Sequence, residues 1–221
     1  ASVRDMLRAR IAHLPPTMRA LAEAHALSIC EALSQRDYAA LQPESDPKSL
    51  DEALTTLVAQ EVLATDGFSY TLPNDELRSV LAAELDDKAR SERHTALAAL
   101  FEGTQRPVLY IVHHLLAADR PEAALDHLFP LLRATGDWIA LLAASQMSPG
   151  AVAQCVARAL DVAERLGRSP RDLNDLRCYL MLLSATADNA LYWRAAPPLL
   201  EQLKHDSGFN SWLELAHVSD P

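Results

Sequence analysis

The residues best suited to chemistry in this chain are two adjacent histidines, His113 and His114. Neighbouring residues on a helix point about 100° apart, so the two imidazoles do not converge on one metal ion. No His-x-x-x-His or Glu-x-x-His spacing occurs, and Cys155 and Cys178 lie too far apart for a local zinc pair. We therefore expect no metal site, with one imidazole packed inside and the other facing solvent.

The motifs of the common catalytic and nucleotide sites do not occur. A phosphate-binding loop needs G-x-x-x-x-G-K-[ST], and a nucleophile elbow needs G-x-S-x-G; the chain contains neither and has six scattered glycines. The carboxylate pairs Asp51-Glu52 and Asp86-Asp87 lie where helix ends are expected, and such acids are usually solvated. The sequence predicts no catalytic residue and no cofactor.

Tryptophans are the strongest candidates for contact with a partner. Trp138, Trp193 and Trp212 are large apolar anchors, for which packing between helices is the default interpretation. Trp193 stands beside Tyr192, and adjacent aromatic residues are typical of binding hot spots. We therefore predict Tyr192 and Trp193 as a partner-binding site.

Composition indicates packed helices and a negatively charged surface. The apolar fraction is 49%, glycine is scarce, aromatic residues make up 5%, and the formal net charge is −10. Such a charge repels phosphate backbones, which disfavours nucleic acid as a partner. The three cysteines lie in apolar surroundings, no apolar run approaches the ~18 residues that span a membrane, and no signal core is visible. We expect a cytoplasmic protein, cut from a longer chain because it starts without Met.

Apolar periodicity predicts a mainly helical chain. The clearest stretch is residues 107–137, which reads as two antiparallel helices that meet near Asp119 and Pro121, with Gly136 as a left-handed cap. The predicted helices cover residues 2–14, 16–28, 30–41, 50–65, 75–85, 88–102, 108–118, 121–135, 138–145, 149–166, 170–186 and 192–204.

Three local signals refine these boundaries. Ser49 to Glu52 reads as a capping box that starts a helix. Residues 68–72 alternate as a strand, which can pair with residues 62–65 through an Asp66-Gly67 turn. Glycines that end helices recur at Gly136, Gly167 and Gly208, with spacings near those of tetratricopeptide (TPR) units. We expect a winged-helix-like domain with flanking helices at residues 1–104 and a degenerate TPR-like array of helical hairpins at residues 105–221.

A family resemblance gives this order of elements a context. The segment LTTLVAQEVLATDGFSYTLPNDELRSVLAAEL (residues 54–85) resembles the region that follows the nucleotide-binding core in STAND-type signalling ATPases, including the large LuxR-type regulators. The blocks Ser91–His94 with Ala96–Ala98, and His114-Leu115 with Ala123-Ala124, extend the similarity over residues 15–137. Leu72–Asn74 stands where that family often has an aromatic residue and a histidine. The resemblance implies a winged helix coupled to helical repeats, with the ATPase core upstream.

The predicted reading helix, residues 50–65, does not suit DNA. It carries Asp51, Glu52 and Glu61, has no basic residue, and offers Gln60 alone to base edges. Arg4, Arg8 and Arg10 form the chain's basic cluster, which we interpret as a solvated or packed helix face.

These observations together predict a non-enzymatic regulatory and protein-interaction segment of a multidomain signalling ATPase or transcriptional regulator. The winged helix would be a structural connector, and the array an arm that binds a partner protein or inhibits the upstream ATPase. A DNA-binding winged-helix transcription factor is the first alternative. An all-helical enzyme whose site is built from scattered residues is the second.

Overall fold

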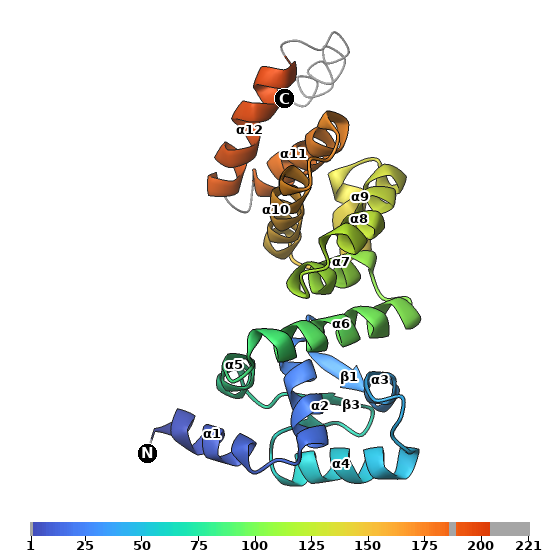
Figure 1. Cartoon of the computed structure of the whole chain (residues 1–221), viewed down its shortest axis with the longest axis vertical. Coiled ribbons are helices and arrows are strands. Elements are labelled where there is room, and N and C mark those ends of the chain that lie inside the picture. Colours follow the sequence, from blue (N-terminus) through green and yellow to red (C-terminus); the bar gives the residue numbers. More distant parts are fainter. Residues whose placement is uncertain (1, 186–188, 204–221) are drawn as a thin grey trace. The chain divides into compact units, whose positions relative to one another are not determined.

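The computed structural model describes residues 2–185 and 189–203, which are mainly helical and include one small three-stranded antiparallel sheet (Figure 1). They divide into two compact units, with the boundary between Ala123 and Ala124. The predicted mainly α class is confirmed, although the sheet has one strand more than the predicted hairpin. Helix α7, which the sequence prediction assigned to the second domain, packs against α6 in the first unit.

The first unit contains the sheet. Its elements up to the hairpin are α1 (Val3–Ala12), α2 (Pro16–Leu27), β1 (Ala32–Ser34), α3 (Gln35–Leu41), α4 (Pro47–Ala59), β2 (Ala64–Thr65) and β3 (Ser69–Thr71). Three further helices follow, which are α5 (Asp75–Ala83), α6 (Asp87–Gly103) and α7 (Val108–Ala117). Helix α2 packs against α5 and α6, and the core holds fully buried side chains such as Leu54, Leu77, Leu97 and Phe101.

The strand β1 overturns the prediction of one helix over residues 30–41. The side chains of Ser34 and Asp37 cap each other's backbone N–H groups, which starts α3 only at Gln35. The residues before this capping box are therefore free to pair with β3, where Leu33 lies opposite Tyr70. The helical spacing of apolar residues included Leu33, but Leu33 is buried as part of strand β1 and not as part of a helix.

The hairpin between β2 and β3 forms as predicted, but its turn is shifted by one residue. Asp66 donates its N–H to the Ser69 carbonyl, so Gly67 and Phe68 are the central turn residues rather than Asp66 and Gly67. Gly67 has φ +91°, which glycine adopts without strain at the first central position of a tight hairpin. The Asp66 carboxylate accepts the N–H groups of Phe68 and Ser69, and Phe68 remains 89% exposed at the tip.

The predicted capping box at Ser49 is wrong, because α4 begins three residues earlier. The Asp46 carboxylate accepts the backbone N–H groups of Lys48 and Ser49, at 3.0 and 3.1 Å, and Pro47 occupies the first helical position. An Asp followed by Pro is itself a strong start signal. Lys48 thus lies on this helix, outside the range that was predicted to lack basic residues.

The second unit is helical throughout the residues described. Helix α8 (Pro121–Thr135) begins in the first unit, and α9 (Trp138–Ser145), α10 (Pro149–Arg165), α11 (Pro170–Ser184) and α12 (Asn189–Leu203) follow. Helix α10 packs on α11, and α11 packs on α12. Ser148 and Ser169 cap helix starts, and Gly136 and Gly167 have positive φ, as predicted. Gly208 lies outside the described residues.

Within the described ranges, no single helix is long and apolar enough to span a membrane. Helices α9 and α10 reach the required length and apolarity only when taken together, across a bend of 108°.

Candidate functional site

The first polar cluster is a buried pair that joins α2 to α3. His25 Nε2 lies 3.0 Å from the Glu31 carbonyl oxygen, and since a carbonyl can only accept, Nε2 carries the proton. His25 Nδ1 therefore accepts the hydroxyl proton of Tyr38, whose ring meets the edge of Tyr70. Burial lowers the pKa of His25 to about 4 and raises the pKa of Tyr38, so both groups stay neutral at physiological pH.

A second buried pair joins α6 to α7. His94 Nδ1 and His114 Nδ1 are 2.8 Å apart, and the other ring nitrogen of His114 has no hydrogen-bond partner. Phe101 packs against the His114 ring at a centroid distance of 5.2 Å. Burial, together with the charges of His113 and His94, lowers the pKa of His114 to about 2. His114 is fully buried and His113 half-buried, so the expectation of one inward imidazole is confirmed.

Two buried carboxylates join segments of the first unit that are distant in the sequence. Glu23 on α2 accepts from Arg19 one turn earlier, at 2.8 Å, and from Arg93 on α6, at 3.3 Å. Asp37 caps α3 and lies 3.5 Å from the Arg106 guanidinium. Glu23 and Asp37 are only 5% and 3% exposed, so each carboxylate needs these partners to offset its lost hydration. We interpret both groups as structural.

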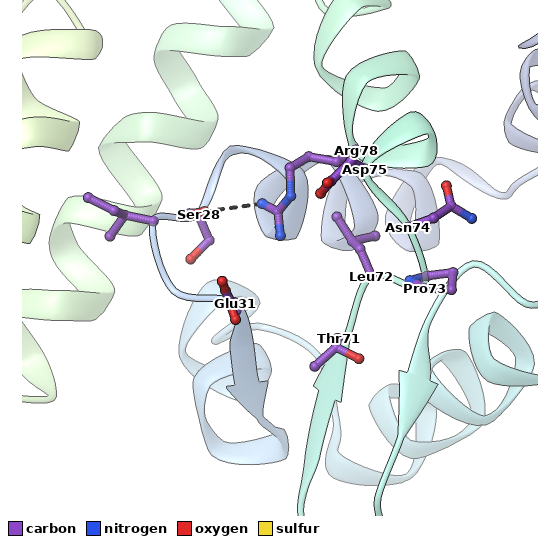
Figure 2. Close-up of a pocket in the computed structure, with 9 residues that line it drawn as sticks. Ser28, Glu31, Thr71, Leu72, Pro73, Asn74, Asp75 and Arg78 are labelled. Atoms are coloured by element: carbon purple, nitrogen blue, oxygen red, sulfur yellow. Dashed lines mark hydrogen bonds between the residues drawn. The ribbon is translucent and has the colours of Figure 1, made fainter. Parts of the chain in front are cut away.

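A pocket with a volume of about 440 Å³ lies in the first unit. Its walls are the loop before β1 and the β3–α5 turn, with the lining residues Ser28, Ile29, Glu31, Thr71, Leu72, Pro73, Asn74, Asp75 and Arg78 (Figure 2).

Arg78 is the only basic side chain that lines this pocket. Its guanidinium already donates hydrogen bonds to backbone carbonyls of the chain. Its Nη1 donates towards the carbonyls of Ala26, Ser28 and His25 at 3.0, 3.3 and 3.4 Å. These are carbonyls at and just beyond the carboxyl end of α2, where a positive charge is favourable. The Ser28 hydroxyl accepts the Cys30 N–H at 3.0 Å, and the lining residues include no His, Lys or Cys.

We expect Arg78→Ala to lower the free energy of unfolding by about 1.5–3 kcal/mol, because three carbonyls lose a charged donor. Arg78→Lys should recover part of this loss, since an ammonium still favours the helix end but cannot reproduce the planar fork. Urea denaturation of both variants measures the effect. A loss below about 0.5 kcal/mol for Arg78→Ala would contradict this role.

Cysteines and metal-ligating residues do not form a reactive centre in the part of the chain that the structure covers. No group of three or more His, Cys, Asp or Glu side chains there is placed to hold a metal ion. All three cysteines are free thiols, and burial raises the pKa of Cys155 to about 12, that of Cys178 to about 11, and that of Cys30. Thiolate chemistry is therefore disfavoured at neutral pH.

The outward face of α4 is acidic, as the sequence indicates. Asp51, Glu52 and Thr55 are exposed there, while Leu50, Leu54 and Leu57 are buried beneath them. Lys48, the single basic residue of the helix, has its Nζ 4.0 Å from Glu52. Gln60 follows the helix as an exposed residue.

The predicted partner-binding residues lie on α12. Trp193 is 64% exposed, and the half-buried Tyr192 ring meets it edge-on at a centroid distance of 5.3 Å. The opposite face of α12 is buried through Ala195, Ala196 and Leu199. The two predicted residues therefore lie together, with the indole turned to solvent. Trp138 is half-buried on α9, and Trp212 lies outside the described residues.

Comparison with known proteins gives no assignment. No family model matches the chain, and comparisons with curated proteins and with solved structures return no match. The resemblance to STAND-type ATPases therefore stays a prediction from the residue pattern.

The buried polar clusters were not predicted from the sequence. One signal was available, because Glu23 stands in an Ala-rich helix with Arg19 four residues earlier, which is the spacing of an ion pair. The His25–Tyr38 pair gave no such signal, since its geometry depends on the unforeseen strand β1.

Proposed function

We propose that this chain is a non-enzymatic regulatory and protein-interaction segment of a larger signalling ATPase or transcriptional regulator. In this proposal the first unit is a winged helix that acts as a structural connector. The helices of the second unit, a degenerate TPR-like array, form the arm that binds a protein partner or inhibits the ATPase.

The order of elements supports the winged-helix part of the proposal. Helix α2, strand β1, helices α3 and α4, and the β2–β3 hairpin follow one another, and the strands lie side by side in the order β1-β3-β2. Helices followed by a capped helix, a β-hairpin and a further helix are the order that the sequence pattern predicts for the winged-helix-like domain at residues 1–104. In this proposal α4 is the counterpart of a reading helix, and the hairpin is the counterpart of a wing.

The acidic face of α4 is the observation that carries the proposal. A helix that enters the major groove needs Arg, Lys, Asn or Gln to contact base edges and cations to contact phosphates. The exposed face offers Asp51 and Glu52, and its Lys48 is within ion-pair distance of Glu52. This face repels DNA, so a role in protein contacts fits it better.

Duplex DNA should therefore not bind this chain. In fluorescence anisotropy at low salt, we expect no saturable binding of a labelled duplex in the micromolar range. The double variant Asp51→Lys, Glu52→Lys is the matched control, because it keeps the helix while reversing two charges. It should gain weak, salt-sensitive binding. Tight binding of DNA by the unmodified chain, with a steep salt dependence, would instead establish the DNA-binding alternative.

A further inference from the structure

The pocket of the first unit lies where three segments of the chain converge. Strand β1 begins and β3 ends at the same edge of the sheet, so Glu31, just before β1, and Leu72, just after β3, both line the pocket. The first turns of α5 add Asp75 and Arg78, which share one face of that helix because they are three residues apart. Acidic, basic and apolar side chains therefore line one hollow (Figure 2).

One side of this pocket presents hydrogen-bond donors that the chain leaves unused. Arg78 donates to three carbonyls through Nη1, but its Nη2 and Nε groups have no acceptor among the described residues. Figure 2 shows the guanidinium directed into the space between Ser28 and Leu72. Ser28 is only 6% exposed, and its hydroxyl accepts the Cys30 N–H but has no acceptor for its own hydrogen within the described ranges. A ligand that accepts from Ser28 and Arg78 would satisfy these donors.

The pocket also presents two carboxylates that are not paired. Glu31 and Asp75 are exposed, and neither side chain forms a hydrogen bond or an ion pair with the part of the chain that the structure describes. They outnumber the single guanidinium, so a plain anion such as phosphate is disfavoured. A plain cation would satisfy the carboxylates but leave the Ser28 and Arg78 donors without an acceptor. The lining therefore matches a ligand that carries a carboxylate and an ammonium together.

The volume and the apolar part of the lining limit the size of such a ligand. Small-molecule pockets span about 300–1,000 Å³, and this one, at about 440 Å³, is near the lower end. Ile29, Leu72 and Pro73 add apolar surface. One amino acid with an aliphatic side chain fits these limits, whereas a nucleotide would place several negative charges beside the two carboxylates.

We propose that this pocket binds a free aliphatic α-amino acid. The α-carboxylate accepts hydrogen bonds from Arg78 and Ser28, the α-ammonium lies against the carboxylates of Glu31 and Asp75, and the aliphatic side chain packs on Leu72. This inference goes beyond the proposed function and does not depend on it, since the pocket uses none of the residues on the acidic face of α4.

The test is an NMR titration of the whole isotope-labelled chain with L-leucine, followed through the backbone amide signals. We expect saturable shifts at Ser28–Glu31 and Thr71–Arg78, with a dissociation constant on the order of 0.1 mM. Isocaproate is leucine without its ammonium, and isoamylamine is leucine without its carboxylate. Each should bind about tenfold more weakly, since each lacks one charged group that the pocket holds.

Three variants separate this site from general charge attraction. Glu31→Gln removes one carboxylate charge and should weaken leucine binding about threefold to fivefold. Glu44→Gln makes the same change on an exposed residue outside the pocket and should leave binding unchanged. Arg78→Lys keeps a positive charge at the end of α2 but lacks the second amino group, so it should weaken binding about tenfold while the helical circular dichroism is retained.

The proposal is overturned if millimolar L-leucine causes no saturable shift, or if the shifts fall outside the pocket. It is also overturned if isocaproate or isoamylamine binds as tightly as L-leucine, or if Glu31→Gln and Glu44→Gln bind L-leucine equally well. Failure of the proposed function has a different signature, which is tight DNA binding in the anisotropy experiment, whatever the leucine titration shows.

Discussion

Lowering the pH from about 7 to about 5 should remove about 4 kcal/mol from the free energy of unfolding, through two buried histidines. His25 and His114 have folded-state pKa values lowered from 6.5 to about 4 and about 2. Below pH 6.5 the unfolded chain therefore binds protons that the folded chain does not. Each histidine then costs about 1.36 kcal/mol per pH unit, or about 2 kcal/mol at pH 5.

The window of this effect follows from the two pKa values. Their contribution to stability is fully present above pH 6.5. The His25 share is lost progressively down to about pH 4, and the His114 share continues to fall below that. The groups near His25 are Tyr38, the Glu31 carbonyl and Arg78. The positive charge of Arg78 also opposes protonation of His25. His94 and His113 face His114.

Urea denaturation at several pH values between 7.5 and 4.5 measures this dependence. His114→Gln is the informative variant, because it removes one titrating group and should roughly halve the slope between pH 6.5 and 5 even if it is less stable at neutral pH. A free energy of unfolding that stays constant across this interval would contradict the burial of both neutral imidazoles.

The second large effect is expected from a matched pair of phenylalanine truncations. Phe101 is 0% exposed on α6 and packs against Tyr110 and His114, whereas Phe68 is 89% exposed at the hairpin tip. Phe101→Ala should lower the free energy of unfolding by about 3–5 kcal/mol, because it removes a large apolar group and leaves a cavity. Phe68→Ala should change it by less than about 0.5 kcal/mol.

Thermal and urea unfolding of the two variants provide the measurement, and the chemical deletion is identical in both. Equal losses would show that Phe101 is not part of a packed core. A large loss for Phe68→Ala alone would mean that the hairpin tip is covered by another part of the protein.

Most helices could be predicted because their signals are local. Each signal acts on the few residues beside it. The structure has helix starts at Asn74, Ser148 and Ser169, and a helix end at Gly167. The failures occurred where two local signals competed. Ser49 offered a capping box, but Asp46 followed by Pro47 lies earlier and caps the same helix.

Long-range pairings could not be predicted in the same way. Strand β1 exists because Leu33 lies opposite Tyr70, a partner 37 residues away, and no pattern within residues 30–34 signals that pairing. The pairs His25–Tyr38 and His94–His114 depend likewise on how separate helices pack. Tyr192 and Trp193 could be picked out because adjacent aromatic residues are visible in the sequence, although only the structure places the indole in solvent.

The buried carboxylate of Glu23 has a further consequence for how α2 and α6 fit together. The Glu23 carboxylate receives guanidinium donors from Arg19 on its own helix and from Arg93 on α6, and the bond from Arg93 restricts the rotation and offset at which α6 can pack on α2. Leucine and alanine neighbours would tolerate several offsets, since apolar contacts have little directionality. We therefore infer that the Arg93–Glu23 bond favours one packing arrangement of α2 and α6 among the several that apolar contacts alone would allow.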